Sequence, residues 1–217
     1  MTHIPALIIG IIVTGYWARV MRLVYKTRRR TGHAANFAPP EPLGQILRLI
    51  WVPLVLVWIA HPWLVGILPI KYLPNLLRPI FESLILSCIA VALALAAMAG
   101  TLICWKKMGK SWRMGINPAE KTELIITGPY AYVRHPIYAL SSLLMLATAA
   151  AVPSPLILAV AVVHIGLLHW EARREERYLL AQHGPAYADY LHHVARFLPC
   201  SLSAYQAQAS KAPQSFS

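Results

Sequence analysis

The chain has 217 residues, of which 58% are hydrophobic and only 13% are charged, whereas about 25% of the residues of a soluble domain are charged. This composition excludes an ordinary soluble globular domain and predicts an integral membrane protein. The formal net charge of +12 raises the question of nucleic-acid binding, which the placement of the basic residues answers below.

Three apolar stretches come first along the chain. Residues 4–18 are apolar and continue past Arg19 to about Val24, and residues 49–70 and 84–105 contain no charged side chain. About 20 residues of helix cross a bilayer core of about 30 Å. The pattern therefore predicts three transmembrane helices.

A fourth apolar block, residues 136–170, also lacks charge but is interrupted by Pro153-Ser154-Pro155. Proline removes backbone donors and disfavours helix in the residue before it, so we expect a tight helical hairpin. Each arm is short for a span and would reach across by extending at its cytoplasmic end. The last helix continues as far as His183-Gly184-Pro185, where a stop signal ends it. The expected fold is an all-α integral membrane protein with about five transmembrane helices.

The basic residues are placed as the positive-inside rule requires. With the N-terminus outside, all 20 Lys and Arg residues except Lys71 and Arg78 fall on the cytoplasmic side. The charge is thus a topology signal with some attraction to anionic membrane lipids, and we expect no nucleic-acid partner. The start of the chain lacks a basic n-region and a small-residue cleavage site, so we expect an anchor helix and not a removable signal peptide.

Three regions follow from this reading of the chain. Residues 1–105 hold three helices and a basic cytoplasmic loop, at 31–44, that contains Pro and Gly. Residues 106–200 form a core made of a polar cytoplasmic connection (106–135), the hairpin and the helical extension. Residues 201–217 are rich in Ala, Ser and Gln, and we expect them to be disordered.

Polar chemistry gathers at the start of the hairpin, in the run GPYAYVRHPIYAL (128–140). His135 precedes proline and is biased toward extended backbone, while Pro136 suits the first position of a helix. The free N–H groups of a helix start, together with Arg134 and His135, predict an anion-binding site.

The other arm of the hairpin brings carboxylates to the same end. Glu171 and Glu175 lie four residues apart on one helix face, with Arg174 and Tyr178 as neighbours. A cavity at this end would offer both an anion site and carboxylates, walled by Tyr130, Tyr132 and Tyr138. Such a cavity suits a zwitterionic ligand that carries an additional cation.

These motifs resemble the isoprenylcysteine carboxyl methyltransferase family, including its bacterial members and the related phospholipid methyltransferases. The resemblance covers about residues 106–199 and rests on GPYAYVRHPIYAL, on GKSWRMGINPAEKTELIITG before it, and on EERYLLAQHGPAYADYLHHVARFLP after it. It implies a methyltransferase of the bacterial inner membrane that uses S-adenosylmethionine. The sulfonium of this cofactor favours aromatic walls.

The candidate cofactor-binding residues combine the positions that match the family's motif with Arg134 of the anion site. The sequence also has no G-x-G turn of the soluble dinucleotide type, so such a cofactor would be held in a helical membrane site. The cofactor set is Glu123, Leu124, Tyr130, Arg134, His135, Pro136, Tyr138 and Glu175.

The acceptor end departs from the family pattern. Eukaryotic members place an arginine, which meets the substrate carboxylate, where this chain has Glu171. A glutamate repels a carboxylate and could take a proton from an acceptor. The candidate catalytic residues are Glu171 and its helix neighbour Arg174. We expect a lipophilic amine, thiol or hydroxyl acceptor, such as a small molecule or a lipid. The alternatives are carboxyl methylation of prenylcysteine-like substrates and a non-enzymatic membrane module that retains the fold.

Simpler interpretations exist for each feature. The tyrosines and Arg134-His135 are also typical of an interfacial belt, and Glu175-Glu176 is typical of a solvated helix face. Trp112-Arg113 is consistent with either a lid over the site or a surface anchor. The lone histidines of the apolar helices are expected to be structural, and no metal-ligand spacing is present. These histidines are His61, His164 and His169.

Overall fold

A computed structural model of the protein describes residues 3–31, 42–113, 124–201 and 203–206. Within these ranges the chain forms helices, short 3₁₀ turns and a single isolated β-bridge, and no strand. The protein is thus an all-α membrane protein, as predicted. Its helices are α1 (His3–Thr31), α2 (Pro42–Ile67), α3 (Leu84–Met108), α4 (Pro136–Ala151), α5 (Pro155–His183) and α6 (Pro185–His193).

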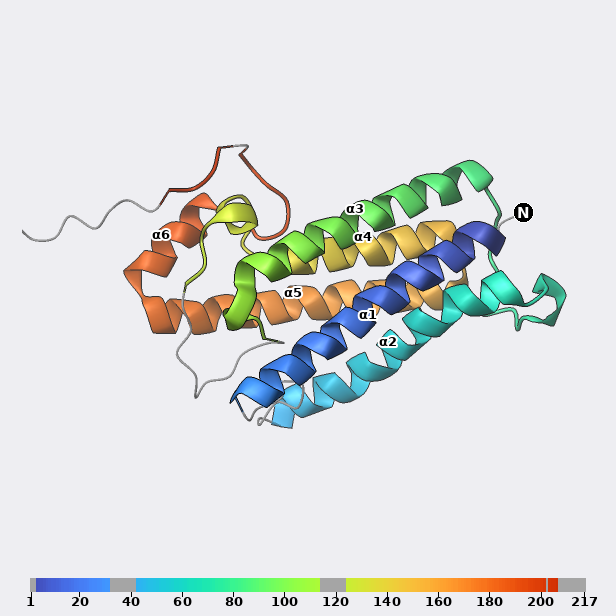
Figure 1. Ribbon diagram of the computed structural model, residues 1–217, viewed down its shortest axis with the longest axis horizontal. Coiled ribbons are helices and arrows are strands. Elements are labelled where there is room, and N and C mark those ends of the chain that lie inside the picture. The colour runs from blue at the N-terminus through green and yellow to red at the C-terminus, as the bar shows by residue number, and fades with distance from the viewer. Residues whose placement is uncertain (1–2, 32–41, 114–123, 202, 207–217) are drawn as a thin grey trace, which may run out of the picture.

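Five of these helices form an elongated bundle, and α6 lies beyond its end (Figure 1). By length and composition, α1, α2, α3 and α5 are long and apolar enough to cross a membrane. Helix α4 has 16 residues, about 24 Å at 1.5 Å per residue. The five predicted apolar helices are all present, and α4 is the short arm that the sequence anticipated.

The hairpin between α4 and α5 turns at residues 152–154, as predicted. The Ser154 hydroxyl accepts a hydrogen bond from the Ile157 N–H at 3.2 Å and so caps α5. The segment between α2 and α3 packs on this turn, since the Ile80 N–H donates to the Pro153 carbonyl and the Leu156 N–H to the Leu76 carbonyl. The start of α1 lies at the same end, where His3 contacts the Val65 carbonyl.

Small residues allow α3 and α4 to pack closely, and these two helices share the most extensive interface of the bundle. On α3, Ala90, Ala94 and Ala97 are fully buried. A Cβ at Gly100 would lie 3.1 Å from two carbons of Leu140, so the glycine permits the approach. This is the usual way in which helices pack within a membrane.

The opposite end of the bundle carries the polar chemistry. Helix α5 ends at Gly184, whose φ of +53° reverses the chain into α6. Residues 203–206, from the tail predicted to be disordered, lie against this region, and the Tyr205 hydroxyl donates to Asp189 at 2.5 Å. The rest of that tail, residues 202 and 207–217, lies outside the described residues. So does most of the predicted loop 31–44, although α2 already begins at Pro42.

Candidate functional site

The segment before α4 is held in place by the chain that follows α6. Val133 forms a β-bridge with Ala195. The Arg134 N–H donates to the Ala195 carbonyl at 2.9 Å, and the His135 N–H donates to the Arg196 carbonyl at 3.0 Å. The His135 backbone, with φ −123° and ψ 62°, is not helical but falls short of the extended conformation predicted from the following proline. It is held by a partner segment that the sequence analysis did not identify.

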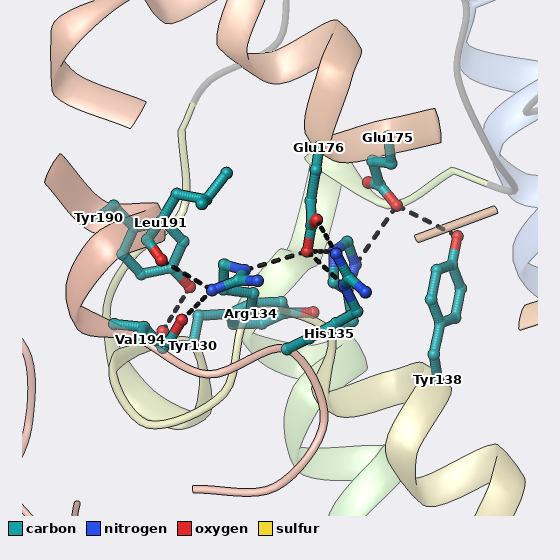
Figure 2. Close-up of polar contacts among 10 residues, drawn as sticks. Tyr130, Arg134, His135, Tyr138, Glu175, Glu176, Tyr190, Leu191 and Val194 are labelled. Atoms are coloured by element: carbon teal, nitrogen blue, oxygen red, sulfur yellow. Dashed lines mark hydrogen bonds and ion pairs between the residues drawn. The ribbon is translucent and has the colours of Figure 1, made fainter. Parts of the chain in front are cut away.

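A buried ion cluster joins the two motifs at this point (Figure 2). Arg134 Nε donates to Glu176 Oε1 at 3.0 Å, and Arg196 donates to both carboxylate oxygens at 2.9 and 2.6 Å. The other end of the Arg134 guanidinium donates to the carbonyls of Leu191, at 2.9 Å, and Val194. Arg134 is therefore bound by the chain itself, and its role is to position the segment next to it.

The simpler interpretation of Glu175-Glu176 as a solvated helix face does not hold for Glu176, whose side chain is only 7% exposed. It is covered because the chain after α6 folds back over α5 and brings Arg196 to it. Glu176 also lies 3.3 Å from Nε2 of His135. Sequence reasoning missed Glu176 and Arg196 as structural partners. The sequence contained one indication of this contact, because Arg196, in ARFLP after the last helix, has no acidic neighbour in sequence.

Glu175 has a different environment from its neighbour. Its side chain is 29% exposed, and Oε2 accepts a hydrogen bond from the Tyr138 hydroxyl at 3.2 Å. His135 Nδ1 lies 3.6 Å from the same oxygen, and the His135 ring stacks on Tyr138 with an interplanar angle of 1°. These three side chains, from both arms of the hairpin, form the polar wall of a cavity (Figure 2).

The cavity has a volume of about 160 Å³ and lies among α1 to α5. Of the predicted site residues, seven line it. Five tryptophans also line it, and Trp112 among them is buried, which favours a role at the site over a surface anchor. The lining site residues are Tyr130, Arg134, His135, Pro136, Tyr138, Glu171 and Glu175; the tryptophans are Trp17, Trp51, Trp105, Trp112 and Trp170.

A second cavity of about 80 Å³ adjoins the first and shares Tyr130, His135 and Glu175 with it. Leu124 lines this smaller space, as do residues of α5 and α6. Glu123, predicted beside Leu124, lies outside the described residues. Tyr132 was expected to wall the cavity and does not, because its side chain is 40% exposed and lines a separate hollow near Asp189.

The acceptor end contains a cation that the sequence analysis assigned only to topology. Arg48 of α2 lines the cavity together with Glu171, and the two charges interact. Arg174 Nη1 lies 3.5 Å from Glu171 Oε2, its guanidinium lies over the Trp170 ring, and it is not among the lining residues. Helices α1 and α2 thus supply part of the cavity wall, although they lie outside residues 106–199, which carry the family resemblance.

Buried tyrosines surround the smaller cavity and are held in their neutral form. Burial raises the pKa of Tyr130, Tyr187 and Tyr190 well above the usual value for tyrosine. The Tyr190 hydroxyl donates to the Tyr130 carbonyl at 2.6 Å. The Tyr130 hydroxyl is buried with no hydrogen-bond partner among the described residues, so it is available to a polar ligand.

Each of the three lone histidines contacts a polar group of the protein. His61 lies 2.8 Å from the Ser154 hydroxyl, His164 lies 3.2 Å from the Ser141 hydroxyl, and His169 contacts the Ile165 carbonyl. No group of three metal-ligating side chains occurs within the described ranges. Of the three histidines, only His164 lines the cavity.

The part of the chain that carries the site is similar to known proteins. Residues 88–181 match the sequence model of the isoprenylcysteine carboxyl methyltransferase (ICMT) family. The nickel-cobalt-cadmium resistance protein NccN of Alcaligenes xylosoxydans xylosoxydans is 28% identical over 123 residues. That alignment covers 56% of this chain and 56% of NccN, so the chain spans about half the length of the curated relative it matches.

Proposed function

We propose that this chain, whose residues 88–181 match the sequence model of the ICMT family, transfers a methyl group from S-adenosylmethionine to a lipophilic acceptor bound within the helix bundle. The main support for the proposal is that the larger cavity has both a polar end and an apolar body. Its polar end is formed by Tyr138, His135 and Glu175, and its body is apolar and aromatic. Small-molecule sites typically combine a mostly apolar lining with a few placed polar groups.

The residues at the polar end fit the cofactor. Its sulfonium and ammonium cations suit the Glu175 carboxylate and the aromatic side chains around it. Tyr130, whose hydroxyl has no hydrogen-bond partner among the described residues, lines both cavities. The cofactor supplies an electrophilic methyl group when bound. The residues that would hold it are Leu124, Tyr130, His135, Pro136, Tyr138 and Glu175, with Glu123 beyond the described residues and Arg134 as a positioning residue.

The chain's own residues then have two tasks, to orient the acceptor and to accept its proton. Alignment of the reacting groups supplies much of the rate of such a transfer. Glu171 lines the cavity four residues before Glu175 and is the candidate base. An acceptor hydroxyl or thiol would lose its proton to the Glu171 carboxylate, and Arg48 would stabilise the negative charge that develops on the acceptor atom.

Arg48 changes the expected acceptor. A cationic amine would bring like charge to a guanidinium in a cavity where repulsion is poorly screened. We therefore place a neutral hydroxyl or thiol ahead of an amine. A second candidate is a carboxylate, as in prenylcysteine-like substrates, because Arg48 and Arg174 both neighbour Glu171 and offset the repulsion predicted from Glu171 alone.

We further propose that the protein lies in a bacterial inner membrane with its site at the cytoplasmic face. The support is the concentration of Arg28, Arg29 and Arg30 of α1 at the site end of the bundle, where Arg30 donates to the Lys110 carbonyl at 2.6 Å. Basic residues favour the cytoplasmic side.

Methyl transfer can be tested with detergent-solubilised protein and cofactor that carries a radiolabelled methyl group. The acceptors are a farnesylated cysteine analogue, a lipophilic thiol and a bacterial lipid extract. A base-stable product from the thiol or the extract supports the first candidate, and a base-labile methyl ester on the cysteine analogue supports the second. Absence of labelled product with every acceptor would count against the proposal, and absence of cofactor binding as well would favour a non-enzymatic module.

A further inference from the structure

Three polar side chains meet at the end of the larger cavity that lies farthest from Glu175. The Ser141 hydroxyl of α4 lies 3.2 Å from Nε2 of His164 of α5, and Tyr16 of α1 is a neighbour of Ser141. All three are buried, and all three line the cavity. We call Tyr16, Ser141 and His164 the distal polar cluster.

The distal polar cluster is separated from the charged end by an apolar stretch. His164 precedes Glu171 by two helical turns, a rise of about 10 Å. Between these levels the wall is formed by Ile137, Leu167 and Leu168. The cavity is therefore charged at one end, apolar in the middle and uncharged but polar at the other end.

A ligand made only of hydrocarbon would suit the apolar stretch, but it would leave the distal polar cluster without a polar partner. A buried polar group without a partner costs free energy, and His164 Nδ1 has no hydrogen-bond partner in the part of the chain that the structure describes. Polar side chains also join helices inside membranes. Examples here that do not line the cavity are the buried pairs Trp58 with Thr148 and His61 with Ser154. The distal polar cluster differs from them because its members form the cavity wall.

We propose that the acceptor carries a second polar group, an uncharged hydroxyl or carbonyl, about 10 Å from the atom that is methylated, and that the distal polar cluster binds it. The assignment of this cavity to the acceptor rests on the proposed function. The substrate class is then a lipophile with polar groups at both ends. A molecule that ends in a bare hydrocarbon tail, such as a prenyl chain, would leave the distal polar cluster unmatched.

The five tryptophans that line the cavity allow a binding test that needs neither cofactor nor activity. The probes are a brominated fatty alcohol and the brominated alkane of equal chain length, whose bromine quenches tryptophan fluorescence on contact. Quenching is titrated in detergent for the wild type, Ser141→Ala, Tyr16→Phe and Thr148→Val. Thr148 is the matched control, because it lies two turns along α4, is fully buried and hydrogen-bonds Trp58 without lining the cavity.

The wild type and Thr148→Val are expected to bind the alcohol about three- to tenfold more tightly than the alkane, the value of one net hydrogen bond. Ser141→Ala and Tyr16→Phe are expected to reduce or abolish this preference. Their thermal unfolding midpoints should equal or exceed that of Thr148→Val. Equal binding of the two probes by the wild type would overturn the inference, as would an equal loss of preference in Thr148→Val. Cofactor titration of the same samples tests the proposed function separately, so that either claim can fail alone.

Discussion

Arg134 and Glu176 connect the two arms of the hairpin through a hydrogen-bonded ion pair of 3.0 Å, with side chains only 9% and 7% exposed. Arg134 immediately precedes the cavity residue His135, and Glu176 immediately follows the cavity residue Glu175. The pair therefore holds in register the two side chains that would contact the cofactor. The two adjacent glutamates thus differ in environment, since Glu176 is bound in the ion cluster and Glu175 lines the cavity.

Glu176→Ala is expected to destabilise the protein by about 3–5 kcal/mol, because it leaves the buried Arg134 without its carboxylate. Thermal unfolding in detergent measures this loss. Glu171→Ala is the matched control on the same helix, and its effect on the unfolding midpoint should be smaller because its side chain is 26% exposed. Similar unfolding midpoints for the wild type and Glu176→Ala would contradict the structural role assigned to this residue.

Stability is expected to fall as the pH rises above about 10, the usual pKa of tyrosine. The pKa of Tyr187 is raised in the folded state by burial, so above pH 10 the unfolded chain loses a proton that the folded chain keeps. The contribution of this group is complete below pH 10 and decreases by up to about 1.4 kcal/mol per pH unit above it. Thermal midpoints measured from pH 8 to 11 should decline less steeply in Tyr187→Phe. An equal slope in both proteins would show that Tyr187 ionises freely when folded.

Arg48 and Glu171 are expected to control the acceptor. Glu171→Gln should lower methylation of a hydroxyl or thiol by about 10²- to 10⁴-fold, the usual contribution of a general base, without weakening cofactor binding. A carboxylate needs no base, so its methylation should fall much less. Glu171→Arg should increase carboxylate acceptance. Initial rates with radiolabelled cofactor measure all three, and a parallel loss with every acceptor would contradict the role of base.

Arg48→Met provides a complementary test of the same pair. It should reduce the rate with hydroxyl, thiol and carboxylate acceptors, because each of these develops or carries negative charge near the guanidinium. An amine acceptor that becomes better in Arg48→Met would support the argument from like-charge repulsion. Unchanged rates would place Arg48 outside the reaction.

The two ends of the bundle are expected on opposite sides of the membrane. Asn75 lies between α2 and α3 at the end that carries the hairpin turn, and Gly184 lies between α5 and α6 at the other end. Reporter fusions should place Asn75 outside and Gly184 in the cytoplasm. The same side for both positions would rule out the proposed topology.

The sequence predicted the elements that depend on local chemistry. Apolar length located the long helices, the residues around Pro153 located the hairpin turn, and Gly184 located the end of α5. The motif spacing correctly brought His135 and Glu175 to one cavity, although their proposed binding of a cofactor stays a prediction. All of these features can be read within one or two neighbouring segments.

The remaining features depend on contacts between distant segments and could not be predicted in this way. In the sequence, Arg48 is one of many basic residues that indicate topology, and only the packing of α2 beside α5 brings it to the cavity. Arg196 lies on a segment that returns from α6 to cover Glu176. Tyr132 was misassigned because the 3₁₀ turn before it directs its side chain outward. Helical periodicity does not extend through such a turn.

Titration calorimetry of S-adenosylmethionine with the detergent-solubilised protein tests the central claim most directly. The wild type is expected to bind with a Kd in the micromolar range, and Glu175→Ala and His135→Ala should weaken binding by about 1.5–3 kcal/mol each, the range for hydrogen bonds to charged groups. Glu82→Ala, a change to an exposed glutamate at the other end of the bundle, should bind like the wild type. Folded wild-type protein that binds no cofactor up to millimolar concentration, or equal affinity in Glu175→Ala, would contradict the account.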